Sequence, residues 1–227
     1  TPTPNGSTVL SNAVRIADGA TLQIVGGVQP NLHPVFAVGN GVGGTQGAIY
    51  ADLSGRAQGD ANTRLSISLT TVASPGVTML TNTTIRVDGT NNAPLAASML
   101  IGHITTSNAL AGIPASYTNY TLTKAGTGQL RIDPANGYTG GNIHVVGGSL
   151  AFGNNGDLPG SQTVTIDAGT YLYCRNVTSM NSVNSTLVVN GLVELDARGN
   201  GSAGSDTTTA TQTIGYLSGS GTVTNGT

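Results

Sequence analysis

The stretch LTKAGTGQLRIDPANGYTGGNIHVVGGSLAF, residues 122–152, decides the fold. Apolar and polar residues alternate along it, the alternation breaks at glycine, and then it resumes. Alternation with a period of two predicts short strands that each have one apolar face. Glycine at the breaks predicts corners, because a corner between two strands often needs a positive φ, which glycine adopts without strain.

The same pattern occurs at three other places in the chain. Each set has two apolar residues spaced two apart, a glycine, and then two more apolar residues with the same spacing. The sets are Val14, Ile16, Gly19, Leu22, Ile24; Ile143, Val145, Gly148, Leu150, Phe152; Val164, Ile166, Gly169, Leu172, Cys174; and Leu187, Val189, Gly191, Val193, Leu195. Both apolar residues of each strand therefore point to one side.

The spacing between sets predicts coils that stack along one axis. Leu130, Leu150, Leu172, Leu195 and Leu217 follow one another at intervals of 20, 22, 23 and 22 residues. This period is too long for a hairpin meander and too short for a strand–helix–strand unit of roughly 30 residues or more. We expect a β-helix with about 20–23 residues per coil, in which strands of successive coils pair in parallel. The five leucines are expected to form one internal column, with Ile132, Phe152 and Cys174 in the adjacent column.

The opening stretch resembles the autotransporter-associated β-strand repeat. The residues that carry the resemblance are Leu122, Thr123, Lys124, Gly126, Gly128, Leu130 and Ile132, followed by Asn136, Tyr138, Thr139 and Gly140. The segment IGYLSGSGTVTNG, residues 214–226, resembles a second turn type of such proteins, and residues 34–85 resemble their looser preceding coils. The resemblance implies an all-β, right-handed parallel β-helix that is exported to the bacterial cell surface, with no cofactor and no catalytic residues.

We expect residues 1–227 to form a single β-helix domain, in which residues 122–152 are the clearest repeat. Residues 197–213 lack periodicity, which predicts a loop inserted at one corner. The segment PLAASMLI, residues 94–101, could begin a helix at Pro94, or it could be a buried strand or a loop.

Composition excludes several classes of function. Charged residues make up 8% of the chain and the net charge is −2, so there is no electrostatic basis for binding nucleic acid. No apolar run reaches the roughly 18 residues of a membrane helix, so we expect no membrane insertion. Low charge suits stacked coils, because like charges repeated in every coil would repel one another. The one cysteine, Cys174, is expected to be a small buried apolar side chain.

The titratable residues do not suggest a catalytic set. Asp18, Asp88 and Asp157 lie beside glycines, where aspartate caps turns. Glu194 and Asp196 are the tightest acidic pair, and Arg198 has the same parity if the strand continues. Asp167 could lie one coil away but sits at a corner, so a solvated strand face explains these residues best. His33, His103 and His144 lack metal-ligand spacing. We therefore predict no catalytic, cofactor-binding or metal-binding residues.

Two functions from different classes remain. The first is a non-catalytic extracellular structural protein at the cell surface: a rigid rod, a self-assembling filament subunit, or a stalk that displays an adhesive face. Its expected partner is itself, head to tail, and surface glycans are a second candidate partner. The second is a glycan-binding or polysaccharide-degrading β-helix, which a cluster of outward acidic and aromatic residues would favour.

Overall fold

The chain is all-β in the computed structural model, which describes residues 13–25, 34–54, 63–64, 76–89, 98–106, 119–132, 138–152, 161–174, 181–195 and 212–225. Within these ranges the one helical element is a short 3-10 turn, η1 (Val42–Gly44). Every pairing between described strands is parallel. The strands form a twelve-stranded and a seven-stranded sheet.

The pairings divide the strands into three walls. The first wall contains β1 (Val14–Arg15), β3 (Val35–Gly39), the start of β6 (Val77–Asp88), β8 (Ile104–Thr106) and β11 (Tyr138–Thr139). The second wall contains β2 (Leu22–Val25), β4 (Ile49–Asp52), the end of β6, β9 (Leu122–Ala125), β12 (Ile143–Val145), β14 (Thr163–Ile166), β16 (Asn181–Val189) and β18 (Thr213–Ser218). The third wall contains β5 (Thr63–Arg64), β7 (Ser98–Ile101), β10 (Gln129–Ile132), β13 (Ser149–Phe152), β15 (Tyr171–Cys174), β17 (Leu192–Leu195) and β19 (Thr222–Asn225).

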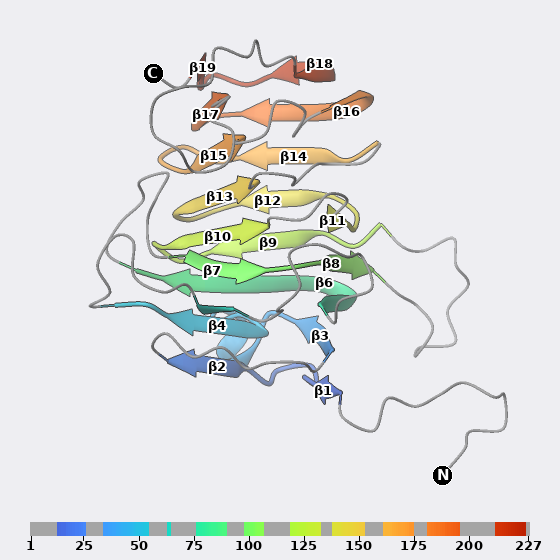
Figure 1. Ribbon diagram of the computed structural model, residues 1–227, viewed down its shortest axis with the longest axis vertical. Helices are drawn as coiled ribbons and strands as arrows, with labels where there is room; N and C mark the ends of the chain where they lie inside the picture. Colours follow the sequence, from blue (N-terminus) through green and yellow to red (C-terminus); the bar gives the residue numbers. More distant parts are fainter. Residues whose placement is uncertain are drawn as a thin grey trace, which may run out of the picture.

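Successive passes of the chain along these walls form a parallel β-helix. Figure 1 shows the strands stacked as rungs, from the blue N-terminal end to the red C-terminal end. Partners in neighbouring coils of the third wall, from Leu130 through Leu150 and Leu172 to Val193, are 20, 22 and 21 residues apart. The expected fold class is thus confirmed, and so is the coil length over this part of the chain.

Aliphatic columns fill the interior. One column of the second wall runs through Ile49, Ile85, Lys124, Val145, Ile166 and Val189. One column of the third wall runs through Met99, Leu130, Leu150, Leu172, Val193 and Val223. All of these side chains except Val223 are buried. Cys174 lies buried over Phe152 in the next column, as predicted.

Two members of the predicted leucine column are placed elsewhere. Val193, and not Leu195, pairs with Leu172, while Leu195 pairs with Cys174 in the adjacent column. The reason is a shorter corner: two residues separate β16 from β17, whereas four separate β14 from β15. Leu217 is on the second wall, where it pairs with Leu187. The prediction was therefore right for Leu130, Leu150 and Leu172 and wrong for Leu195 and Leu217.

The two irregular segments fall partly outside the described residues. β7 forms the second half of the segment 94–101, so this half is a strand and not a helix or a loop. Residues 197–211 of the predicted loop lie outside the described residues. Thr213, the last residue of the predicted loop, is the first residue of β18. Among the described residues, no helix has the length and apolar character to span a membrane.

Candidate functional site

One group of outward polar side chains lies on β4 and β6 of the second wall. Tyr50 pairs with Arg86, and Asp52 pairs with Asp88, so the four side chains occupy two neighbouring rungs. Strands in a sheet are about 4.8 Å apart, which keeps all four within reach of one ligand. We call these four residues the β4–β6 patch.

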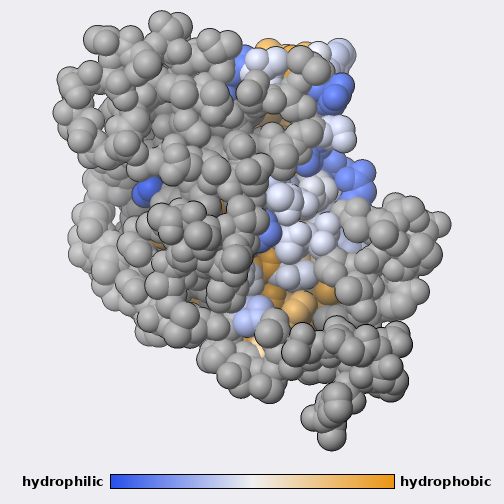
Figure 2. Space-filling view, turned by 45° about the vertical axis from the view of Figure 1, so that its right-hand side comes forward, coloured by the Kyte–Doolittle hydropathy of each residue, from blue (hydrophilic) through white to orange (hydrophobic). Residues whose placement is uncertain are grey.

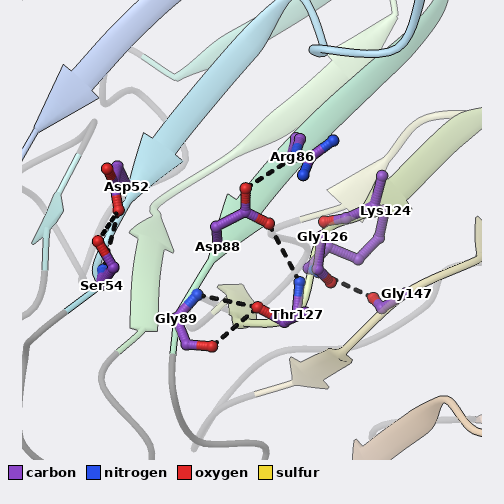
Figure 3. A network of polar contacts seen from close by, with 10 residues as sticks. Asp52, Ser54, Arg86, Asp88, Gly89, Lys124, Gly126, Thr127 and Gly147 are labelled. Carbon is purple, nitrogen blue, oxygen red and sulfur yellow. Dashed lines mark hydrogen bonds and ion pairs between the residues drawn. The ribbon is translucent and has the colours of Figure 1, made fainter.

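Hydrogen bonds within the protein already occupy both carboxylates of the patch (Figure 3). Arg86 Nε donates to Asp88 Oδ2 at 2.9 Å, and the backbone N–H of Thr127, one coil away, donates to Asp88 Oδ1 at 3.3 Å. Asp52 Oδ1 accepts from both the backbone N–H and the hydroxyl of Ser54, at 2.9 and 2.5 Å. Turn capping thus explains Asp52, while Asp88 joins two coils and does not simply cap its own corner.

Electrostatics in the patch favour a charged carboxylate at Asp52 and a protonated hydroxyl at Tyr50. The bonds from Ser54 lower the pKa of Asp52, which keeps this group a carboxylate. Burial raises the pKa of Tyr50, and the nearby charges of Asp52 and Asp88 raise it further. The guanidinium carbon of Arg86 lies 5.8 Å from the centre of the Tyr50 ring, a cation–π distance. Glycosidic cleavage needs a carboxylic acid held protonated beside a carboxylate. With an aromatic face, a guanidinium and a charged carboxylate, the patch has the groups that bind a polar ligand.

A second polar pair joins two coils farther along the second wall. His144 Nε2 lies 2.9 Å from Asp167 Oδ1, and both side chains are 40% exposed. His144 faces outward, as predicted, and pairs with Thr165 of the next coil. His144 and Asp167 were not linked from the sequence. The spacing shared by their two sets could have linked them, because it places Thr165 opposite His144 and Asp167 two residues farther along the same coil.

The other candidates predicted from the sequence do not come together in the described residues. Glu194 is half-buried on β17 in register with Tyr173, whereas Asp196 and Arg198 lie outside the described part of the chain. His103, between β7 and β8, lies 3.4 Å from the Thr139 hydroxyl, and burial lowers the pKa of its imidazole. His33 and Asp157 also fall outside the described ranges.

The motif residues of the opening stretch have structural roles. Tyr138 is fully buried, and its hydroxyl donates to the Asn142 carbonyl at 3.0 Å. Asn142 Oδ1 accepts from the backbone N–H of Thr163 at 2.9 Å, which joins two coils at the corner before β12 and β14. Lys124 is also fully buried, a position that was not anticipated from the sequence. The pattern in this stretch therefore encodes coil packing.

Among the described residues, no group of three or more His, Cys, Asp or Glu side chains is placed to hold a metal ion. Comparisons of the chain with protein-family models, curated proteins and solved structures gave no significant match. The function must therefore be inferred from the geometry of the chain itself.

Proposed function

We propose that the protein is a non-catalytic structural rod that extends by head-to-tail assembly with further copies of itself. The observation that carries this proposal is the apolar surface of the last described rung. Leu217 and Val223 occupy inward positions, directly above Leu187 and Val193. The two lower residues are 1% and 0% exposed, whereas Leu217 and Val223 are 54% and 39% exposed.

The exposed rung has the chemistry of a stacking surface. Tyr216, beside Leu217 on β18, is 63% exposed, and no charged residue occurs in residues 212–225. Figure 2 shows apolar colour reaching the surface at the end of the molecule where β18 and β19 lie. Within the described strands, β18 pairs with β16 and β19 pairs with β17, so these two strands are the last of their walls there. A strand at the edge of a sheet can template further pairing.

A second copy of the chain would offer β2, in its N-terminal rung, to this surface. β2 pairs with β4 alone among the described strands, and its inward side chains are the half-buried Leu22 and the buried Ile24. Parallel stacking of β2 on β18 would continue the second wall across the joint, in the same direction and with the same strand spacing. Such a contact joins the C-terminal rung of one copy to the N-terminal rung of the next. Because it continues along the axis and does not close into a ring by rotation, it generates an open filament.

The location is part of the same proposal. The resemblance of residues 122–152 to the autotransporter-associated repeat supports an exported protein at the bacterial surface. A rod with a largely aliphatic interior suits that setting, because its stability rests on cooperative stacking between neighbouring coils. Outward side chains along its length would then supply an adhesive face.

Assembly can be tested with the untagged chain and two variants. We expect sedimentation velocity to show species that grow with concentration, and electron microscopy to show filaments. Leu217→Asp should leave the chain monomeric, because a carboxylate would be buried at the joint. Val146→Asp is the matched control, since Val146 is 40% exposed but lies between β12 and β13, away from both ends of the rod. A wild-type chain that stays monomeric at high concentration, or a Leu217→Asp variant that assembles normally, would contradict the proposal.

A second candidate function, glycan binding, is favoured by the β4–β6 patch. Tyr50 offers an aromatic face, and Asp52, Arg86 and Asp88 offer acceptors and donors on neighbouring rungs. If the patch binds polysaccharide, Tyr50→Ala should reduce binding at least tenfold on a glycan array or by calorimetry. Tyr216→Ala, at the end of the rod, should leave binding unchanged. Equal binding by wild type and Tyr50→Ala would exclude this site.

A further inference from the structure

An ionisable side chain interrupts the aliphatic column of the second wall. Lys124 is paired with Ile85 on one side and with Val145 on the other, and its exposed fraction is 0%. A lysine at such a position is unusual, because burying an unpaired ammonium is costly and lysine is almost never fully buried without partners. Its surroundings must therefore account for where it lies.

Backbone carbonyls at the corners of two successive coils surround the amine. Lys124 Nζ donates to the carbonyls of Ala125 at 2.7 Å and Gly126 at 3.2 Å, both in its own corner. It also donates to the carbonyl of Gly147 at 3.0 Å, in the corner of the next coil. An ammonium has three N–H donors, so three carbonyls match its capacity. A neutral amine has only two donors and would leave one carbonyl without its partner.

The charges around Lys124 come from one neighbouring strand. β9 packs against β6 and β12. On β6, Asp88 favours the ammonium and Arg86 disfavours it, and these two side chains are bonded to each other (Figure 3). Tyr50 and Asp52 of β4 lie in register with that pair. On β12, His144 points outward and bonds Asp167. The column neighbours themselves are aliphatic.

We propose that Lys124 makes the middle of the rod respond to pH, by taking up a proton on acidification while it stays buried between the corners of two coils. Burial lowers the pKa of Lys124 to about 7. The Asp88 carboxylate raises this pKa and the Arg86 guanidinium lowers it further, both by less than burial does. In the unfolded chain the same amine has an ordinary pKa near 10.4. Between about pH 7 and 10 the unfolded chain therefore holds a proton that the folded chain lacks, so stability rises with pH in this range. Below about pH 7 both states are protonated, and the burial of the charge weakens the fold most.

Other buried groups act in the opposite direction at higher pH. Burial raises the pKa of Cys174 and of Tyr173 to about 12 and raises the pKa of Tyr138 as well. These groups ionise first in the unfolded chain, which lowers stability as pH rises above roughly 8.5. The effect of Lys124 is therefore clearest between about pH 7 and 8.5, and it should be measured against a variant that keeps all the other groups.

The experiment compares wild type with Lys124→Met by denaturant unfolding from pH 6 to 8.5. We expect the ratio of the two folding equilibrium constants to be flat below about pH 7. Above about pH 7, the wild-type constant divided by the Lys124→Met constant should increase with pH. The increase should approach tenfold per pH unit, which is the slope expected for one proton. If the free energies of unfolding of wild type and Lys124→Met change with pH in parallel over this range, the proposal is overturned.

A second measurement does not depend on whether Lys124→Met folds. NMR titration of the Lys124 side chain in the wild-type protein gives the midpoint of its protonation directly. A midpoint near 7 supports the proposal, and a midpoint above 9 overturns it.

Discussion

Replacing Gly148 by alanine is expected to destabilise the fold by about 2–5 kcal/mol, the sum of two effects. Gly148 has φ 60°, a conformation that costs an L-residue about 1–2 kcal/mol. A Cβ at this position would also collide with the carbonyl oxygens of Gly126 and Gly128, in the preceding coil. Because these atoms belong to the backbone, the coils would have to move apart.

Gly169, at the equivalent corner of the next coil, is the matched control. Its φ is 77°, but a Cβ there would meet nothing within 4 Å. Gly169→Ala should therefore cost only the conformational part, about 1–2 kcal/mol. Denaturant unfolding of both variants separates the two effects. Equal losses of stability would mean that the corners do not stack as closely as described.

Truncation of Leu150 is expected to have an effect of similar size. Leu150 is fully buried in the middle of its column, between Leu130 and Leu172. Leu150→Ala should lower the free energy of unfolding by about 2–5 kcal/mol, through lost apolar transfer and a cavity that stacked coils cannot easily close.

Leu217→Ala makes the same chemical change at a surface position. Since Leu217 is 54% exposed, its truncation should alter the stability of the monomer by about 0.5 kcal/mol or less. Both variants should be measured by denaturant unfolding below the concentration at which the chain assembles. A large loss for Leu217→Ala in the monomer would mean that the last rung is covered within a single chain.

Much of the fold could be predicted because two constraints act locally. Strand geometry requires apolar residues two apart, and corners require glycine or short polar residues, so both appear in the sequence at fixed spacing. Aligning whole sets gives the observed register, in which Ile143 opposes Val164 and Val164 opposes Leu187. Counting leucines alone misplaced Leu195, because it ignored the shorter corner before β17.

The polar groups were harder to predict because their partners lie in other coils. Asp88 bonds Thr127 across 39 residues, and the long coil between β6 and β9 gave no periodic signal that would align them. The β4–β6 patch was missed for the same reason. The burial of Lys124 follows from its inward position in the alternation, but charge normally argues for solvent exposure. Its three carbonyl partners become visible only when two corners are stacked.

The most direct test of the stacked coils is the distance between spin labels on Thr123 and Ser218, two outward positions of the second wall. Register connects them through His144, Thr165 and Val188, so they are four rungs apart although 95 residues separate them in sequence. With about 4.8 Å per rung, pulsed electron resonance should give a narrow distribution centred near roughly 19 Å, widened only by the label linkers. A broad distribution, or one centred beyond about 30 Å, would contradict the stacked parallel coils on which every inference about this protein depends.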